Sequence, residues 1–104
     1  MEIKDEFLLK KYMPSCENMQ TMSTFFYAFS DLTRLKVIIL LMIKPLCVGD
    51  ISFVLDVNQT TVSHQLKILK SLNIVDFKRE GKNVVYFIKN TRIESVLNAS
   101  VECF

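Results

Sequence analysis

Glycine and proline are scarce in this chain, and histidine is nearly absent. The 104 residues include two glycines, two prolines and one histidine, and 50% of them are hydrophobic. So few chain-breaking residues predict one compact domain built mostly of regular helices and strands. There is no glycine-rich phosphate loop and no evident carboxylate pair, so the sequence argues against an enzyme. Solvated charges or helix caps better explain Glu17, Asp31, Asp50 and Asp56.

Long apolar runs and a regular cysteine framework are also missing. The longest aliphatic run extends only from Val37 to Ile43, which is too short to cross a membrane and suits a protein core. Residues 1–6 have mixed charge and lack the apolar stretch of a signal peptide. The three cysteines have no framework spacing, which argues against a disulfide-stapled secreted fold. We therefore expect a cytoplasmic protein with no membrane partner.

The most informative stretch is residues 58–73, NQTTVSHQLKILKSLN. At roughly 100° per residue, one apolar stripe of a helix would contain Val62, Leu66, Leu69 and Leu72. Asn58 is a suitable N-cap, because its side chain can accept from the free amides of the first turn. The other face has no acid and offers hydroxyls and amides, then lysines: Gln59, Thr60, Ser63, His64, Lys67 and Lys70. Such groups suit base edges and phosphates, although an ordinary surface helix shows the same amphipathic pattern.

Residues 74–88, IVDFKREGKNVVYFI, follow at once and predict a β-hairpin. Two runs of β-branched and aromatic residues flank a polar turn, where Gly81 can adopt the positive φ of a tight turn. The tip is basic, because it contains one acid, Glu80, and three cations, Lys78, Arg79 and Lys82. A polar-faced helix followed by a basic hairpin is the winged helix-turn-helix pattern. In that fold the helix enters the major groove and the wing lies along the backbone or in the adjacent minor groove.

The distribution of charge supports the same surface. Residues 58–89 contain six Lys/Arg and two Asp/Glu, a net charge of +4, whereas the whole chain carries +2, so the remaining residues carry −2. Basic charge is therefore concentrated on the expected reading helix and wing, which favours double-stranded DNA as the partner. A winged-helix module that binds protein is the competing interpretation. Retention on duplex DNA with a steep salt dependence would separate the two.

Apolar periodicity predicts helices on both sides of this unit. They are expected over residues 1–13, 17–30, 32–42, 47–55 and 91–104. Asp31 would cap the 32–42 helix, in which Arg34 and Lys36 are expected to stay in water. The core-facing residues of that helix would be Leu35, Ile38, Ile39 and Met42. The fold expected for the single domain 1–104 is thus mainly α with a β-hairpin wing: an N-terminal arm over 1–16, the helix-turn-helix over 47–73 and the wing over 74–89.

Two of these helices have apolar faces that a monomer of this size would leave exposed. The 17–30 helix carries Met19, Met22, Phe25, Phe26 and Phe29 at helical spacing. The 91–104 helix carries Ile93, Val96, Leu97 and Val101. The methionine and phenylalanine stripe could also suggest a soft-metal or ligand pocket, but core or dimer packing explains it better. We expect a homodimer that pairs through these helices and presents two reading heads to two half-sites.

Several motifs now resemble one family. They are AFSDLTRLKVIILL at 28–41, PLCVGD at 45–50, VSHQLKIL at 62–69 and FKREGKNVVYF at 77–87. Together they are similar to the ArsR/SmtB family of dimeric bacterial repressors, over roughly residues 17–102. The resemblance implies a winged helix-turn-helix fold dimerised through its first and last helices. It also implies operator binding that an inducer, usually a metal ion, relieves.

The chain departs from this family's metal sites. The zinc site on the last helix needs an Asp-x-His near its start, where this chain has Asn90-Thr-Arg92, and Cys103 falls where a later histidine would. Arginine cannot ligate zinc and an amide is a poor ligand, so that site is expected to be absent. The family's other site uses a Cys-Val-Cys, of which Cys47-Val-Gly49 keeps only the first thiol, and Cys16 is one candidate from the arm.

The three cysteines, Cys16, Cys47 and Cys103, therefore leave three interpretations open: a site for a thiophilic metal or metalloid, a thiol-based redox or electrophile switch, or structural thiols. Cys47 is the most interesting, because the dipole and free amides of a helix start favour a thiolate. His64 also has three interpretations: a base or phosphate contact, a surface hydrogen-bonding residue, or a link from the reading helix to the dimer. No metal ligand set or cofactor is assigned with certainty. A repressor of this family without a metal or thiol inducer stays an alternative.

Overall fold

The computed structural model describes residues 5–102, and side chains as far as residue 99. The elements in chain order are α1 (Glu6–Tyr12), α2 (Cys16–Phe29), α3 (Leu32–Ile43), β1 (Leu46–Cys47), α4 (Val48–Leu55), α5 (Gln59–Ser71), β2 (Val75–Glu80), β3 (Asn83–Ile88) and α6 (Arg92–Glu102). Each predicted helix and the predicted hairpin has a counterpart among the described residues; residues 1–4 and 103–104 of the predicted first and last helices lie outside them. Cys103 lies outside the described residues.

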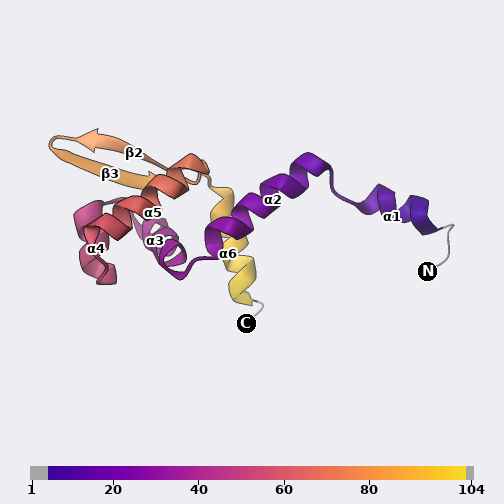
Figure 1. Ribbon diagram of the computed structural model, residues 1–104, viewed down its shortest axis with the longest axis horizontal. Helices are drawn as coiled ribbons and strands as arrows, with labels where there is room; N and C mark the ends of the chain where they lie inside the picture. The colour runs from indigo at the N-terminus through magenta and orange to yellow at the C-terminus, as the bar shows by residue number, and fades with distance from the viewer. Residues whose placement is uncertain (1–4, 103–104) are drawn as a thin grey trace.

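The molecule is elongated, with extents of 62 × 28 × 20 Å. Helices α3, α4 and α5, the sheet and α6 form a body, while α1 and the first half of α2 extend away from it (Figure 1). No residue of α1 is buried. A single chain therefore leaves α1 and much of α2 without packing. No helix in the described part of the chain is long and apolar enough to span a membrane.

The sheet has three antiparallel strands in the order β1-β3-β2. In the hairpin, Val75 pairs with Ile88, and the turn places Gly81 at a φ of +63°, as predicted. The short strand β1 lies on the other side of β3, where Cys47 pairs with Val85. Sequence reasoning did not indicate β1 and treated Cys47 only as a helix start. The pairing ties the beginning of α4 directly to the wing.

The core lies between α3, α5 and the base of the sheet. Its buried hydrophobic residues are Ala28, Val37, Ile38, Leu41, Ile51, Val62, Leu66, Leu69, Ile74, Val75 and Ile93. Three of them come from the predicted apolar stripe of α5, which confirms its orientation. Ile93 anchors α6 to the body, and Leu97 packs partly against the same core.

The buried stripe of α3 differs from the predicted one. Of the four residues expected to face the core, Ile38 is buried, whereas Ile39 is 46% exposed. The residues buried in α3 are Arg34, Val37, Ile38 and Leu41. Nine of the twelve residues of this helix are apolar, and Val37 to Ile43 form an unbroken apolar run, so the sequence pattern alone could not fix the rotation of the helix about its axis.

The prediction that Arg34 stays in water is wrong. Its side chain is only 7% exposed, and its guanidinium donates to backbone carbonyls at the end of α2 and to Gln65 of α5. A buried charge is tolerable when it is hydrogen-bonded, and these three bonds give each guanidinium nitrogen one acceptor. Lys36, in contrast, is exposed as expected.

Two predicted N-caps are confirmed. The carboxylate of Asp31 accepts from the backbone N–H of Arg34 at 2.9 Å, and the amide oxygen of Asn58 accepts from that of Thr61 at 2.8 Å. Each cap satisfies an amide that the first helical turn leaves without a partner, a stabilisation of about 1 kcal/mol. They fix where α3 and α5 begin.

Candidate DNA-binding surface

The outer face of α5 is polar, exposed and without acid. The predicted groove-facing residues are all exposed, and they are Gln59, Thr60, Ser63, His64 and Lys67. On the opposite side, Val62, Leu66 and Leu69 are fully buried. Short donors and acceptors lie in the first two turns, where the helix dipole also favours an anion, and Lys67 follows. Hydroxyl and amide groups can bond base edges, and the lysine can bond a phosphate.

Helix α4 packs against α5. Ile51 is fully buried and Leu55 packs against the same core. Between the helices Asp56 adopts a left-handed conformation with a φ of 54°, and Ser52 Oγ donates to the carbonyl of Val57. This tight, side-chain-bonded turn fixes the angle between the two helices. Val54 of α4 is 58% exposed.

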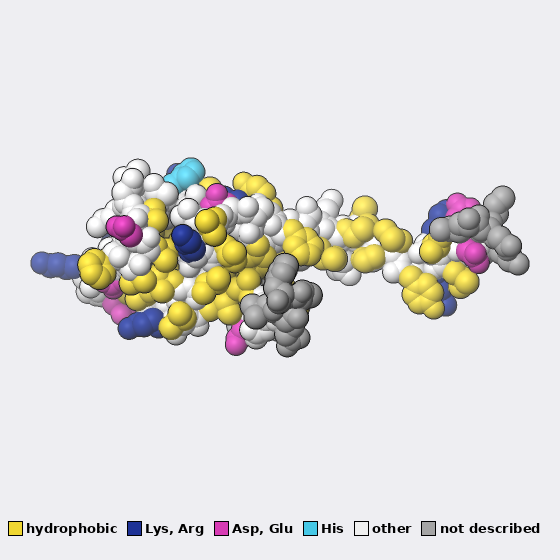
Figure 2. Space-filling model, turned by 90° about the horizontal axis from the view of Figure 1, so that it is seen from below, with side chains coloured by type: hydrophobic (Ala, Val, Ile, Leu, Met, Phe, Trp, Pro, Cys, Tyr) yellow, Lys and Arg dark blue, Asp and Glu magenta, His cyan; other side chains and the backbone are white. Residues whose placement is uncertain are grey.

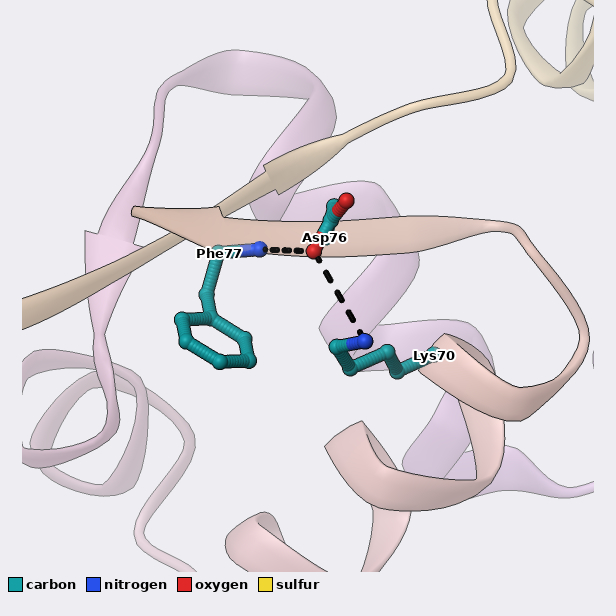
Figure 3. A network of polar contacts seen from close by, with 3 residues as sticks. All are labelled: Lys70, Asp76 and Phe77. Atoms are coloured by element: carbon teal, nitrogen blue, oxygen red, sulfur yellow. Dashed lines mark hydrogen bonds and ion pairs between the residues drawn. The ribbon is translucent and has the colours of Figure 1, made fainter. Parts of the chain in front are cut away.

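The far end of α5 is joined to the wing. The ammonium of Lys70 lies 3.9 Å from Oδ1 of Asp76 and 5.4 Å from the ring centroid of Phe77. Figure 3 shows the same Asp76 oxygen between this ammonium and the backbone N–H of Phe77, which donates to it at 2.8 Å. Part of the charge of Lys70 is thus used inside the protein. Sequence reasoning assigned Lys70 to DNA alone and did not indicate this contact.

The wing carries its charge near its tip. Lys78 lies 3.2 Å from Glu80, so this pair is largely neutral. No ion pair within the described residues involves Arg79 or Lys82. Figure 1 shows the hairpin extending past the end of the body. Arg79 and Lys82 are therefore the wing cations best placed to meet a phosphate.

The two described cysteines lie in different parts of the chain. Cys16 is exposed at the start of α2, and half-buried Cys47 precedes α4. Figure 1 places these two helix starts far apart along the long axis, so one chain cannot bring the thiols together. The thiol of Cys47 donates to the carboxylate of Asp50 at 3.2 Å. No group of three or more metal-ligating side chains gathers among the residues that the structure describes.

A polar groove of about 230 Å³ lies beside Cys47, between the α3–β1 connection and the wing. It is lined by Lys44, Pro45, Leu46, Cys47, Asp50, Lys78, Glu80, Asn83 and Val85. The thiol is thus accessible to a small reagent. A substituent on the thiol would lie beside the wing, near Lys78, Glu80 and Asn83.

Apolar side chains are exposed on α2 and α3. On α2, Phe26 is 62% and Tyr27 53% exposed, and on α3 Ile39 and Ile43 are exposed. An apolar groove of about 340 Å³ lies between α3 and α6, lined by Ile39, Met42, Ile43, Leu97 and Asn98. Figure 2 shows hydrophobic side chains gathered across the body and continuing along α2. This surface is much more apolar than that of α5 and the wing.

Comparison with known proteins identifies the family. Residues 31–76 match the family described as bacterial regulatory protein, arsR family. The cadmium resistance transcriptional regulatory protein CadC of Listeria innocua is 42% identical over 82 residues, which cover 78% of this chain and 69% of that protein. The chain belongs to the ArsR family.

Other ArsR-family relatives and solved structures agree. The transcriptional repressor SmtB homolog of Synechocystis is 37% identical over 79 residues, covering 76% of this chain and 60% of that protein. HlyU from Vibrio cholerae superposes with a TM-score of 0.79 at 21% identity, covering 86% of this chain and 98% of that one. A homodimeric winged helix-turn-helix DNA-binding domain from Mycobacterium bovis superposes with a TM-score of 0.70 at 23% identity, covering 89% and 95%. The winged helix-turn-helix fold is thereby confirmed.

Membership of the ArsR family also settles the class of protein. The chain is a transcriptional regulator with a winged helix-turn-helix DNA-binding fold, and it is not an enzyme. Two features of this ArsR-family chain were not predicted, the burial of Arg34 against Gln65 and the contact of Lys70 with the wing. For the contact of Lys70 with the wing, the only available signal was the alternating pattern of the strand that contains Phe77. The burial of Arg34 against Gln65 had no signal in the sequence.

Proposed function

We propose that this protein is a homodimeric repressor that binds double-stranded operator DNA through α5 and the wing and is released by an inducer. The observation that carries the proposal is the acid-free, fully exposed face of α5 beside a basic wing. Gln59, Thr60, Ser63 and His64 would read bases, while phosphate contacts would come from Lys67, Lys70, Lys78, Arg79 and Lys82. Double-stranded DNA is the partner that such a surface favours, and we propose that the protein acts in the cytoplasm.

Dimerisation is supported by the apolar surface described above. The exposed side chains of α2 and the groove between α3 and α6 are the kind of surface that a second copy covers. A twofold pair would also give each dimer two copies of α5, so that it binds two half-sites about one helical turn apart. The Mycobacterium bovis neighbour is described as homodimeric, in line with this proposal.

We place inducer sensing at the thiols, with Cys47 as the first to react. Cys47 pairs with β3 of the wing and begins α4, which supports α5, so a bond formed at its sulfur would disturb both DNA-contacting elements. The reagent would be a thiophilic metal or metalloid ion or an electrophile. A zinc site at the start of α6 is not proposed, because Asn90 there accepts from the backbone N–H of Arg92 at 3.0 Å and neither residue is a suitable ligand.

Selection of a duplex from a randomised pool tests the DNA-binding proposal directly. The wild-type protein should enrich a pseudo-palindromic sequence and bind it with an affinity that falls steeply with salt, with a slope of about 0.9 per phosphate contact. Lys36→Ala, a lysine change on the exposed side of α3, serves as the charge control. Failure to enrich any duplex at low salt would contradict the proposal and favour a protein-binding module.

A further inference from the structure

Arg34 joins three helices through one guanidinium. Its Nε donates to the carbonyl of Ala28 at 3.3 Å and its Nη2 to that of Tyr27 at 3.2 Å, both near the C-terminal end of α2. The guanidinium also stacks on the Tyr27 ring, 4.8 Å from its centroid. The Tyr27 carbonyl also accepts from the backbone N–H and the hydroxyl of Ser30. Because the last carbonyls of a helix carry the negative end of its dipole, a cation there is favourable. Arg34 therefore fixes the end of α2 to α3.

The third nitrogen reaches the reading helix. Nη1 of Arg34 donates to Oε1 of Gln65 at 3.3 Å, across a sequence separation of 31 residues. Gln65 is half-buried and lies one residue after His64 on α5. The planar fork of arginine holds these directions at once, which the single ammonium of a lysine cannot do. A rotation of α5 about its axis relative to α2 would break this bond.

The Gln65 bond is not required to satisfy a fully buried group. Since Gln65 is half-buried, water can replace the guanidinium at its amide oxygen if the bond is lost. Arg34 itself keeps its two carbonyl acceptors and the Tyr27 ring. Loss of the bond would therefore leave the fold in place, with α5 still held by its buried Val62, Leu66 and Leu69, but it would remove the polar tie that joins α5 to the end of α2.

We propose that Arg34 is a positioning residue for DNA recognition, which holds Gln65, and so α5, in a fixed orientation relative to the exposed apolar face of α2. This inference rests on the proposed function, because it assumes that α2 pairs the two chains and that α5 reads DNA. In a dimer joined through α2, the clamp sets the relation between the two copies of α5. Binding to two half-sites depends on that relation, whereas binding to one does not.

Gln65→Met and Arg34→Lys test the proposal, with Gln20→Met on the exposed side of α2 as the matched control. Each protein is titrated with the duplex that the wild type selects and with a duplex that keeps one half-site and scrambles the other. Gln65→Met should bind the two-site duplex roughly tenfold more weakly, a small part of the gain from linking two sites. Its one-site affinity should stay within about twofold of wild type, and so should its dimer dissociation constant.

The double variant supplies the second criterion. If the two residues act through one bond, Arg34→Lys should reproduce the Gln65→Met effect, and the double variant should be no worse than either single variant. An equal loss on both duplexes would mean that Gln65 contacts DNA itself, and an unchanged two-site affinity would mean that the bond positions nothing. Either result overturns the proposal. If Arg34→Lys does not fold, Gln65→Met alone still decides, and a wild type that selects no duplex defeats the proposed function instead.

Discussion

Single side chains on α5 have two kinds of surroundings. The first two turns present Gln59, Ser63 and His64 to solvent, whereas Lys70 near the end lies against Asp76 and Phe77 of the wing. A side chain with no internal partner is free to bond DNA, and one that is already engaged must give up its partner first. Substitutions of Gln59, Ser63 or His64 should therefore affect DNA binding differently from a substitution of Lys70.

Gln59→Ala should relax sequence preference, because a lost base contact costs roughly 1–3 kcal/mol on the selected duplex and little on others. Lys82→Ala should weaken binding to every sequence alike and reduce the salt slope by about 1. Anisotropy titrations with the selected duplex and a scrambled duplex, over a range of salt, measure both quantities. The roles are reversed if Lys82→Ala loses discrimination while Gln59→Ala keeps it.

Lys67→Ala should lower affinity for all duplexes more than Lys70→Ala does. Lys67 is exposed and has no ion pair among the described residues, whereas Lys70 shares its charge with Asp76. Lys70→Ala should also cost stability, by about 0.2–1 kcal/mol for an exposed pair. Urea unfolding and duplex titration of both variants would check this, and equal salt slopes for the two would contradict it.

At the scale of elements, the wing and α4 are joined through β1, which pairs with β3 of the wing and leads directly into α4. Cys47 is the last residue of β1, caps α4 and lies beside the wing groove. A covalent substituent at this sulfur would enter the groove, next to the strand pairing with Val85 and the start of α4. Both adjoin elements that we propose to contact DNA.

A thiol-specific alkylating reagent should accordingly lower the operator affinity of the wild type and of Cys16→Ser, but not that of Cys47→Ser. To act as a switch, the reagent must discriminate between the two states by a few kcal/mol, which is roughly a hundredfold in affinity. Operator titrations with and without reagent give the result, and the extent of modification by mass serves as control. A Cys47→Ser protein that still responds in full would place sensing elsewhere.

Elements with a local cause could be predicted from the sequence. Asn58 caps its own helix, Gly81 takes the positive φ of its own turn, and the stripe of α5 has a clear period. Features that depend on distant partners could not. Two residues of β1 have no period to detect, and the burial of Arg34 depends on Gln65, which is 31 residues away. The sequence could predict which residues of α5 are exposed and can be proposed for DNA contact, but not which lysine the wing engages.

For the whole molecule, the main consequence of the elongated shape is that one chain is incomplete. Helix α1 buries no residue, and α2 exposes Met19, Met22, Phe26 and Tyr27 along its length. A second copy would remove this apolar surface from water, which stabilises the pair by about 25 cal/mol for each Å² of apolar surface buried. Stability and DNA affinity should therefore both depend on protein concentration.

Phe26→Asp should convert the dimer to a monomer, because it places a charge in the middle of the apolar face of α2. The monomer should lose the advantage of two linked half-sites, about 10²- to 10⁴-fold in affinity for the two-site duplex. Light scattering and duplex titration measure the two effects, with Gln20→Met as a control on the same helix. A dimeric Phe26→Asp protein would show that α2 is not the pairing surface.

The arrangement of the sheet has a consequence for solubility. β2 has a neighbour on one side only, and an open strand edge of this kind can recruit strands from other copies and start fibre growth. Here the open edge carries Lys78, Arg79 and Glu80, and the opposite edge strand has only two residues. Charges and shortness both discourage strand addition. The wing cations that we propose as phosphate contacts therefore also discourage aggregation of the free protein. Neutralising them should promote aggregation in concentrated solution as well as weaken the proposed binding to DNA.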